Sequence, residues 1–351
     1  MENIIVDDKE NILNTYKRYN VVLESGHGAI LIDINKKEYI DFSSGIGTNA
    51  FGVCDHEWVE AVCKQANTLQ HTSNLYYSIP QVKLAKLLIE KTGMKKVFFS
   101  NSGAESNEGA IKAARKYSFD KYGQGRSEII TLQNSFHGRT IATLSATGQD
   151  VFHQYFYPFV GDFRYAPAND IEALNSLISE RTCAIMIETV QGEGGVNALD
   201  PKFIQYIDRI CKNKDLVFIV DEVQTGNGRC GYLYSYMEYG VTPNIVTTAK
   251  GLAGGLPFGA ILFDEKLENT LTYGTHATTF GGNPVCAAAA YSVLSRLNDE
   301  LLKHVLDCRK IIEEELSTVK NVIAITGKGL MVGIEIAPHL KASEVVGCLL
   351  Y

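Results

Sequence analysis

This sequence lacks the patterns that indicate a nucleic-acid-binding protein or a membrane protein. It contains no run of Lys and Arg residues, and its formal net charge is −7, whereas nucleic-acid binding requires clustered cations. No apolar run approaches the roughly 18 residues that a transmembrane helix needs, and residues 1–10 are too polar for a secretory signal. We therefore expect neither a nucleic-acid partner nor a membrane partner, and a cytoplasmic location.

The cysteines also lack the spacing of a metal site. The eight cysteines include no Cys-x-x-Cys pair and no cluster with histidine at zinc-ligand spacing. Isolated, reduced thiols are typical of cytoplasmic proteins. The sequence therefore predicts neither a disulfide framework nor a metal site.

The sequence does have the composition of a large globular enzyme. Its 351 residues are 45% hydrophobic and 21% charged, which is enough for a sizeable core. From about residue 82, short apolar runs alternate with helix-length segments, and this predicts an α/β fold with a mainly parallel sheet between helices. The expected strands are 97–99, 129–132, 184–187, 216–220 and 245–248.

The two ends of the sequence follow a different pattern. Residues 26–42 predict an antiparallel meander, and residues 288–316 predict a long helix that is kinked or broken near Asn298. Further strands are expected at 322–325 and 331–336. The expected division is residues 1–50 with a small α+β domain, residues 51–287 as the large domain, and residues 288–351 as the rest of the small domain.

Ligands of parallel sheets bind beyond the carboxyl ends of the strands, so the residues after each expected strand are the candidates for a site. Ser102, Gly103 and Ala104 precede a helical segment, whose free backbone N–H groups can hold a phosphate. An ordinary helix cap is the alternative. Phe136 and Arg139 could supply a stacking ring and a carboxylate clamp, or else a core ring and a solvated charge.

Two charged residues follow the last two strands expected in the large domain. Asp221 ends a buried strand and needs a partner, which could be a metal ion, a salt bridge or a protonated ring nitrogen. Lys250 is followed by three glycines within five residues. It is either a surface ammonium or a desolvated amine that can form an imine with a carbonyl compound.

Taken together, these residues match the requirements of one cofactor. A phosphate site, a stacking ring, a carboxylate for a pyridinium nitrogen and a lysine for an aldehyde are the groups that bind pyridoxal 5′-phosphate. The alternative is a dinucleotide-dependent oxidoreductase on a Rossmann sheet, but no G-x-G-x-x-G motif follows an expected strand.

Six ordered motifs resemble those of the class III aminotransferases, and most closely those of the acetylornithine aminotransferases. The motifs are SGAESNE (102–108), FHGRT (136–140), EGG (193–195), DEVQTG (221–226), TAK (248–250) and TFGGNP (279–284). The similarity extends over nearly the whole chain. It implies the fold type I of pyridoxal-phosphate-dependent transferases, with a seven-stranded sheet in the large domain.

The resemblance implies a set of cofactor-binding residues. Gly103 and Ala104 would bind the phosphate through their N–H groups, beside Ser102, while Phe136 and Val223 would cover the two ring faces. The other implied positions are Asp221 at the pyridine nitrogen, Gln224 near the ring hydroxyl, Lys250 at the aldehyde, His137 among the cofactor-binding residues, and Thr279 at the phosphate of a neighbouring subunit. A homodimer with a shared active site follows from the position of Thr279.

The resemblance also implies how substrates are bound. Arg139 would bind a substrate carboxylate, and Glu193 would be a gating glutamate that pairs with a second arginine when the amino donor binds. In relatives that arginine lies in a further strand and helix, whereas this sequence ends at Tyr351, so we expect the small domain to be incomplete. The segment 51–57 also lacks the His-x-His-Pro that is common in the family.

The expected function is transfer of the ω-amino group of N2-acetylornithine to 2-oxoglutarate in arginine biosynthesis. Ornithine, succinylornithine and 4-aminobutyrate are alternative donors. An inactive truncated relative is a more distant alternative.

Overall fold

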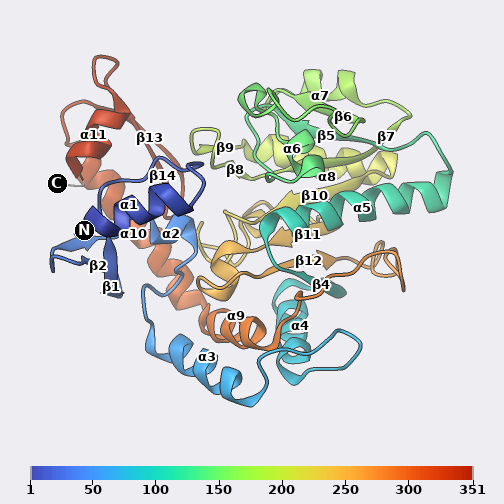
Figure 1. Cartoon of the computed structure of the whole chain (residues 1–351). Helices are drawn as coiled ribbons and strands as arrows, with labels where there is room; N and C mark the ends of the chain where they lie inside the picture. The colour runs from blue at the N-terminus through green and yellow to red at the C-terminus, as the bar shows by residue number, and fades with distance from the viewer. Residues whose placement is uncertain (1, 350–351) are drawn as a thin grey trace.

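A computed structural model describes residues 2–349, and its centre is a seven-stranded sheet (Figure 1). The strand order is β4 (Lys96–Ser100), β12 (Gly259–Phe263), β11 (Ile245–Thr248), β10 (Val217–Asp221), β7 (Thr182–Ile187), β5 (Glu128–Leu132) and β6 (Phe163–Ala166). Neighbouring strands are parallel except at β12, which is antiparallel to both β4 and β11. The expectation of a mainly parallel sheet is confirmed.

The sequence predicts five of these strands to within two residues at each end and misses β6 and β12. β6 is a four-residue edge strand that includes the exposed Arg164, so it has no continuous apolar run. β12 is buried throughout, but it follows the glycine-rich segment 251–255, which obscures where a strand begins.

Helices and short turns connect and cover the sheet. The helices are α1 (Glu2–Asn11), α2 (Ser44–Gly47), α3 (His56–Thr68), α4 (Ile79–Thr92), α5 (Gly103–Tyr122), α6 (Ile141–Ala146), α7 (Ile171–Leu177), α8 (Pro201–Lys214), α9 (Pro284–Arg296), α10 (Asp299–Ser317) and α11 (Ala342–Leu349). The 3-10 turns are η1 (Asp150–Phe152), η2 (Ser235–Tyr239) and η3 (Lys250–Ala253). No helix among residues 2–349 is long and apolar enough to cross a membrane.

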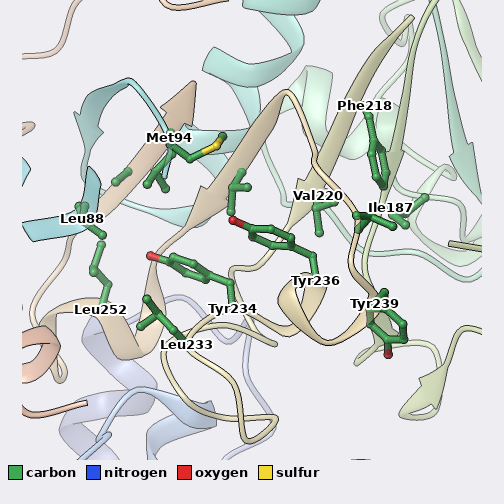
Figure 2. Packing of buried hydrophobic residues seen from close by; sticks show 14 of the residues in the cluster. Leu88, Met94, Ile187, Phe218, Val220, Leu233, Tyr234, Tyr236, Tyr239 and Leu252 are labelled. Carbon is green, nitrogen blue, oxygen red and sulfur yellow. The ribbon is translucent and has the colours of Figure 1, made fainter. Parts of the chain in front are cut away.

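Alternate residues of β10 point to opposite faces of the sheet, and each face has its own core. Val217 and Ile219 pack in one buried cluster with alanines of α5. Phe218 and Val220 pack in the other cluster with residues of α8 and η2, and Figure 2 shows Val220 near Tyr236. Because helices cover both faces, the strands are apolar throughout rather than alternating in polarity.

Helix α5 lies very close to the sheet because its buried side is made of small residues. A Cβ on Gly109 would come within 2.3 Å of the Ile261 side chain. Ser102 caps the helix by accepting a hydrogen bond from the Glu105 N–H at 3.2 Å. The helix therefore begins at the carboxyl end of β4, beside the ends of β10 and β11.

The terminal segments form smaller units. The predicted meander is confirmed as β1 (Leu23–His27), β2 (Ile30–Asp33) and β3 (Glu38–Ile40), and β13 (Val322–Lys328) pairs with β14 (Met331–Ile336). A small ribbon, β8 (Val190–Gln191) and β9 (Asn197–Ala198), follows β7. The predicted helix break is confirmed, since α9 ends at Arg296 and Asn298 caps α10. The domain boundaries stay a prediction, although α9 packs along α3 and α4.

Candidate active site

The carboxyl ends of β4, β5, β10 and β11 surround a cavity of about 620 Å³. Ten of the twelve predicted site residues line it, namely Ser102, Gly103, Ala104, Phe136, His137, Arg139, Asp221, Val223, Gln224 and Lys250. Parallel strands end at the same edge of a sheet, and this brings together segments that are far apart in the sequence.

Asp221 is the last residue of β10 and is only 3% exposed. One carboxylate oxygen accepts hydrogen bonds from His137 Nδ1 at 2.8 Å and from Asn107 Nδ2 at 2.7 Å. The other oxygen accepts from the Val223 N–H at 3.0 Å. These donors offset the cost of burying the carboxylate and fix its orientation.

His137 is buried and pairs with Asp221, yet its Nε2 atom has no hydrogen-bond partner among the described residues. Burial by itself opposes protonation of the ring. The hydrogen bond to Asp221, with the charges of Asp221 and Glu188, outweighs burial and raises the pKa of His137. The histidine therefore supports the carboxylate electrostatically as well as sterically.

Lys250 begins η3 with a left-handed backbone, at φ 44°, directly after β11. This conformation is uncommon for a residue other than glycine and is found where the surroundings impose it. Burial lowers the pKa of Lys250, although the charges of Asp221, Glu193 and Glu188 oppose the shift. Within residues 2–349 its amine has no hydrogen-bond or ion-pair partner, so it is available to act as a nucleophile or base.

The start of α5 is shaped for close approach of a ligand. A Cβ on Gly103 would lie 2.6 Å from Val223 Cγ1, so only glycine leaves Val223 in place. Ser102 is an ordinary cap, as the alternative interpretation held, but the N–H groups of Gly103 and Ala104 find no acceptor among the described residues. The segment can therefore be both a helix cap and an anion site, because the cap uses the side chain of Ser102 and the anion site would use the N–H groups of Gly103 and Ala104.

Phe136 and Arg139 both contact the ring of Phe152. The Phe136 N–H donates to Glu188 Oε2 at 2.9 Å. The Arg139 guanidinium lies over the Phe152 ring, 4.1 Å from its centroid, and 5.5 Å from the centroid of Phe136. Arg139 is neither in the core nor paired with a carboxylate among the described residues.

Sequence reasoning missed Asn107 and Glu188, which both line the cavity. Asn107 lies within the SGAESNE motif, and its Oδ1 atom accepts from Thr247 Oγ1 at 2.7 Å. Glu188 directly follows β7, so the strand-end rule could have found it. Burial, followed by the charge of Asp221, raises the pKa of Glu188 to about 7 despite opposing contributions from His137 and Lys250.

Two predicted residues do not line the cavity. Glu193 is exposed, although its charge acts on Lys250. Thr279 is exposed and lines a separate hollow of about 520 Å³ together with Leu75 and His71. The structure therefore does not bring Thr279 to the site of its own chain.

Comparison with known proteins identifies the family. A family model described as aminotransferase class III matches residues 13–348. The chain belongs to the class III aminotransferases. This family is in general dependent on pyridoxal phosphate. Membership of this family excludes the alternative of a dinucleotide-dependent oxidoreductase. The antiparallel strand β12 also differs from the parallel strands of a Rossmann sheet.

Individual relatives of this class III aminotransferase cover most of its length. An acetylornithine aminotransferase from Haemophilus ducreyi is 48% identical over 97% of this chain and 88% of its own. One from Methanocaldococcus jannaschii is 46% identical over 95% of this chain and 85% of its own. Both of these relatives are named as acetylornithine aminotransferases, which agrees with the activity class of the family.

Solved structures show the same fold. An ornithine aminotransferase from Toxoplasma gondii is similar with a TM-score of 0.94, at 31% identity, over 99% of this chain and 85% of that one. An N-acetylornithine aminotransferase from Stenotrophomonas maltophilia gives a TM-score of 0.77 at 34% identity, over 92% of this chain and 82% of that one. The predicted fold type I is confirmed.

Proposed function

We propose that this class III aminotransferase binds pyridoxal 5′-phosphate in the cavity at the strand ends. The observation that carries the proposal is that a desolvated amine, Lys250, and a hydrogen-bonded carboxylate, Asp221, line the same cavity. A volume of about 620 Å³ is in the range of small-molecule sites. The free N–H groups of Gly103 and Ala104 suit a phosphate.

When bound, the cofactor supplies an electron sink that stabilises a carbanion at the amine-bearing carbon of the substrate. Asp221 would hold the proton of the ring nitrogen, because a carboxylate fixed by His137 and Asn107 favours a cation beside it. Lys250, with its lowered pKa, would accept and return the proton at that carbon through Nζ. Phe136 and Val223 would hold the ring between them, and Gln224 would lie near its hydroxyl.

The proposed reaction moves the ω-amino group of N2-acetylornithine to 2-oxoglutarate and gives N-acetylglutamate 5-semialdehyde and glutamate. The names of the relatives that are 41–48% identical over most of this chain support this donor. Ornithine is the second candidate, because ornithine aminotransferases are among the solved structures with the highest TM-scores. Succinylornithine and 4-aminobutyrate stay alternatives.

We propose that Arg139 binds a substrate carboxylate and that Glu193 is a gating glutamate that pairs with a second arginine when the amino donor binds. An unpaired guanidinium at the mouth of the cavity supports the first role. The influence of the Glu193 charge on Lys250 supports the second.

We further propose a cytoplasmic homodimer in which Thr279 approaches the phosphate site of the partner subunit. The exposure of Thr279, in a hollow that shares no lining residue with the cavity of its own chain, supports this arrangement.

Spectroscopy and covalent trapping test the cofactor proposal. The purified protein should absorb visible light, and borohydride should link the cofactor covalently to Lys250 and not to Lys266, a half-buried lysine outside the site. Lys250→Ala should eliminate turnover. A colourless protein that stays unlabelled after incubation with the cofactor would disprove the proposal. Values of kcat/KM for the four candidate amines then identify the donor.

A further inference from the structure

Within residues 2–349, Phe152 is the aromatic ring nearest to the Arg139 guanidinium. The two lie 4.1 Å apart, and Phe152 also meets Phe136 edge to face, with centroids 5.9 Å apart and an interplanar angle of 74°. Arg139 donates no hydrogen bond to any of residues 2–349. The contact with a ring therefore holds the guanidinium in place and leaves its N–H groups available to a ligand.

A neutral ring and a carboxylate would differ in whether they leave the charge and the N–H groups of Arg139 available to a substrate. A carboxylate neighbour would occupy the N–H groups and cancel the charge, so a substrate carboxylate would have to displace it. An aromatic face attracts the cation through its quadrupole and leaves both charge and donors in place. Stacking also restricts a long, exposed side chain before the substrate arrives, which lowers the entropic cost of binding.

The backbone around Phe152 is anchored on both sides. Gln149 Nε2 donates to the Ser135 carbonyl at 3.0 Å, and the His153 ring is hydrogen-bonded to the Leu144 carbonyl at 2.9 Å. The His153 ring also packs on Tyr165 of β6, with centroids 5.8 Å apart. The residues that flank η1 are thus bound to the loop after β5, to α6 and to β6, and these contacts fix the position of the Phe152 ring.

We propose that Phe152 is a positioning residue that sets Arg139 to receive the carboxylate of the amino donor. This inference rests on the proposed function, in which Arg139 binds that carboxylate. Phe152 touches neither the substrate nor the cofactor in this scheme. It determines whether the enzyme distinguishes an amine with a carboxylate from the same amine without one.

The test compares two donors that differ only in the carboxylate, N2-acetylornithine and N-acetyl-1,4-diaminobutane. Phe152→Leu should lower kcat/KM for the first by roughly 3- to 30-fold, mainly through KM, as expected for loss of a cation–π contact. It should leave kcat/KM for the second unchanged. Phe152→Tyr should behave as wild type, and so should Tyr155→Leu, which removes an exposed ring from the same loop.

A double-variant cycle and a binding measurement separate positioning from general packing. In an Arg139→Leu background, Phe152→Leu should have no further effect on either donor. Calorimetry with N2-acetylnorvaline, which keeps the carboxylate but cannot react, should show a similar 3- to 30-fold rise in Kd for Phe152→Leu. The cofactor absorbance should be unchanged, because Phe136 stays in place.

Each failure has a different meaning. Equal losses for both donors, loss of bound cofactor, or an undiminished effect of Phe152→Leu in the Arg139→Leu background would overturn the role of Phe152 and leave the proposed function intact. If Arg139→Leu itself does not change the ratio of the two donors, the proposed role of Arg139 is wrong as well. If N2-acetylornithine is no donor, ornithine and 1,4-diaminobutane replace the pair.

Discussion

At the scale of the residue, the arrangement around Asp221 explains how a carboxylate can be almost fully buried. His137 and Asn107 share one oxygen of Asp221, and the backbone of Val223 binds the other. Each donor also belongs to a different segment, so the carboxylate ties α5, the loop after β5 and the end of β10 together. Removing the charge of Asp221 should therefore change both the rate of the reaction and the pKa of His137.

Asp221→Asn should keep the fold and the bound cofactor but lose on the order of 100-fold or more in kcat, since a fixed charge is removed from a site of low dielectric. The Asp221 charge raises the pKa of His137, so that pKa should fall in the variant. Steady-state rates and an NMR titration of His137 measure both effects. Asp120→Asn, a change at an exposed position on α5, is the control. A near-normal rate in Asp221→Asn would contradict the role of this residue.

At the scale of the element, the loop after β10 depends on a second buried carboxylate. Glu222 is fully buried and accepts hydrogen bonds from Thr225 Oγ1 at 2.6 Å, from the Ser235 N–H at 3.0 Å and from the Tyr236 N–H at 2.7 Å. It therefore fastens the segment that carries Val223 to the start of η2. Burial raises the pKa of Glu222 to about 7, against the opposing effect of these donors.

This pKa predicts how stability depends on pH. A carboxyl group whose pKa is raised above its ordinary value of 4.5 binds protons more tightly in the folded state. Its contribution is therefore complete below about pH 4.5 and is lost as the pH rises through about 7, on the order of 3 kcal/mol in total. The free energy of unfolding in urea at about pH 5 and about pH 8 should show the decline.

The Glu222→Gln variant should have a much flatter pH dependence between these values, although its stability at low pH should be lower because an amide donor faces backbone N–H groups. Glu172→Gln, on the exposed side of α7, should keep the slope of the wild type. A slope that is unchanged in Glu222→Gln would assign the decline to other groups, of which Glu188 is the first to test because its pKa is also raised.

At the scale of the whole molecule, the surface near Thr279 suggests that the site is completed by a second copy. Leu75, which lines the same hollow as Thr279, is 88% exposed, and the neighbouring Tyr77 is 99% exposed. Exposed apolar groups of this size are typical of surfaces that another protein covers. The phosphate site in the cavity and Thr279 would then belong to different subunits.

Mixed dimers test this arrangement. Lys250→Ala should be inactive, and Thr279→Glu should bind the cofactor poorly because a carboxylate would face its phosphate. When both chains are expressed together, about half of the dimers are mixed, and each mixed dimer has one intact site, so activity should return to about one quarter of the wild-type value. No recovery in dimers shown to be mixed would place Thr279 at the site of its own chain, and normal cofactor binding by Thr279→Glu would place it outside the site.

The sequence by itself determined the central strands and the residues at their ends. A strand buried on both faces is a continuous apolar run, so the sequence is enough to predict β5, β7, β10 and β11. The residues that follow each run lie at the ligand-binding edge of the sheet. That rule, applied to Asp221 and Lys250, and the six motifs were enough to predict the family and the cofactor site. The edge strand β6 carried too little of this pattern to be found, and the glycine-rich segment before β12 obscured where that strand begins.

Only the tertiary structure decided which side chains meet. Asn107 and Asp221 are 114 positions apart, and Phe136 and Glu188 are 52 apart, so no spacing in the sequence indicates their hydrogen bonds. How separate segments pack also determines the burial of Lys250 and the partners of Asp221. The contact between Arg139 and Phe152 depends on packing in the same way. Periodicity reports what one segment buries, whereas a site depends on distances between segments, and these are fixed when the sheet forms and its strand ends converge.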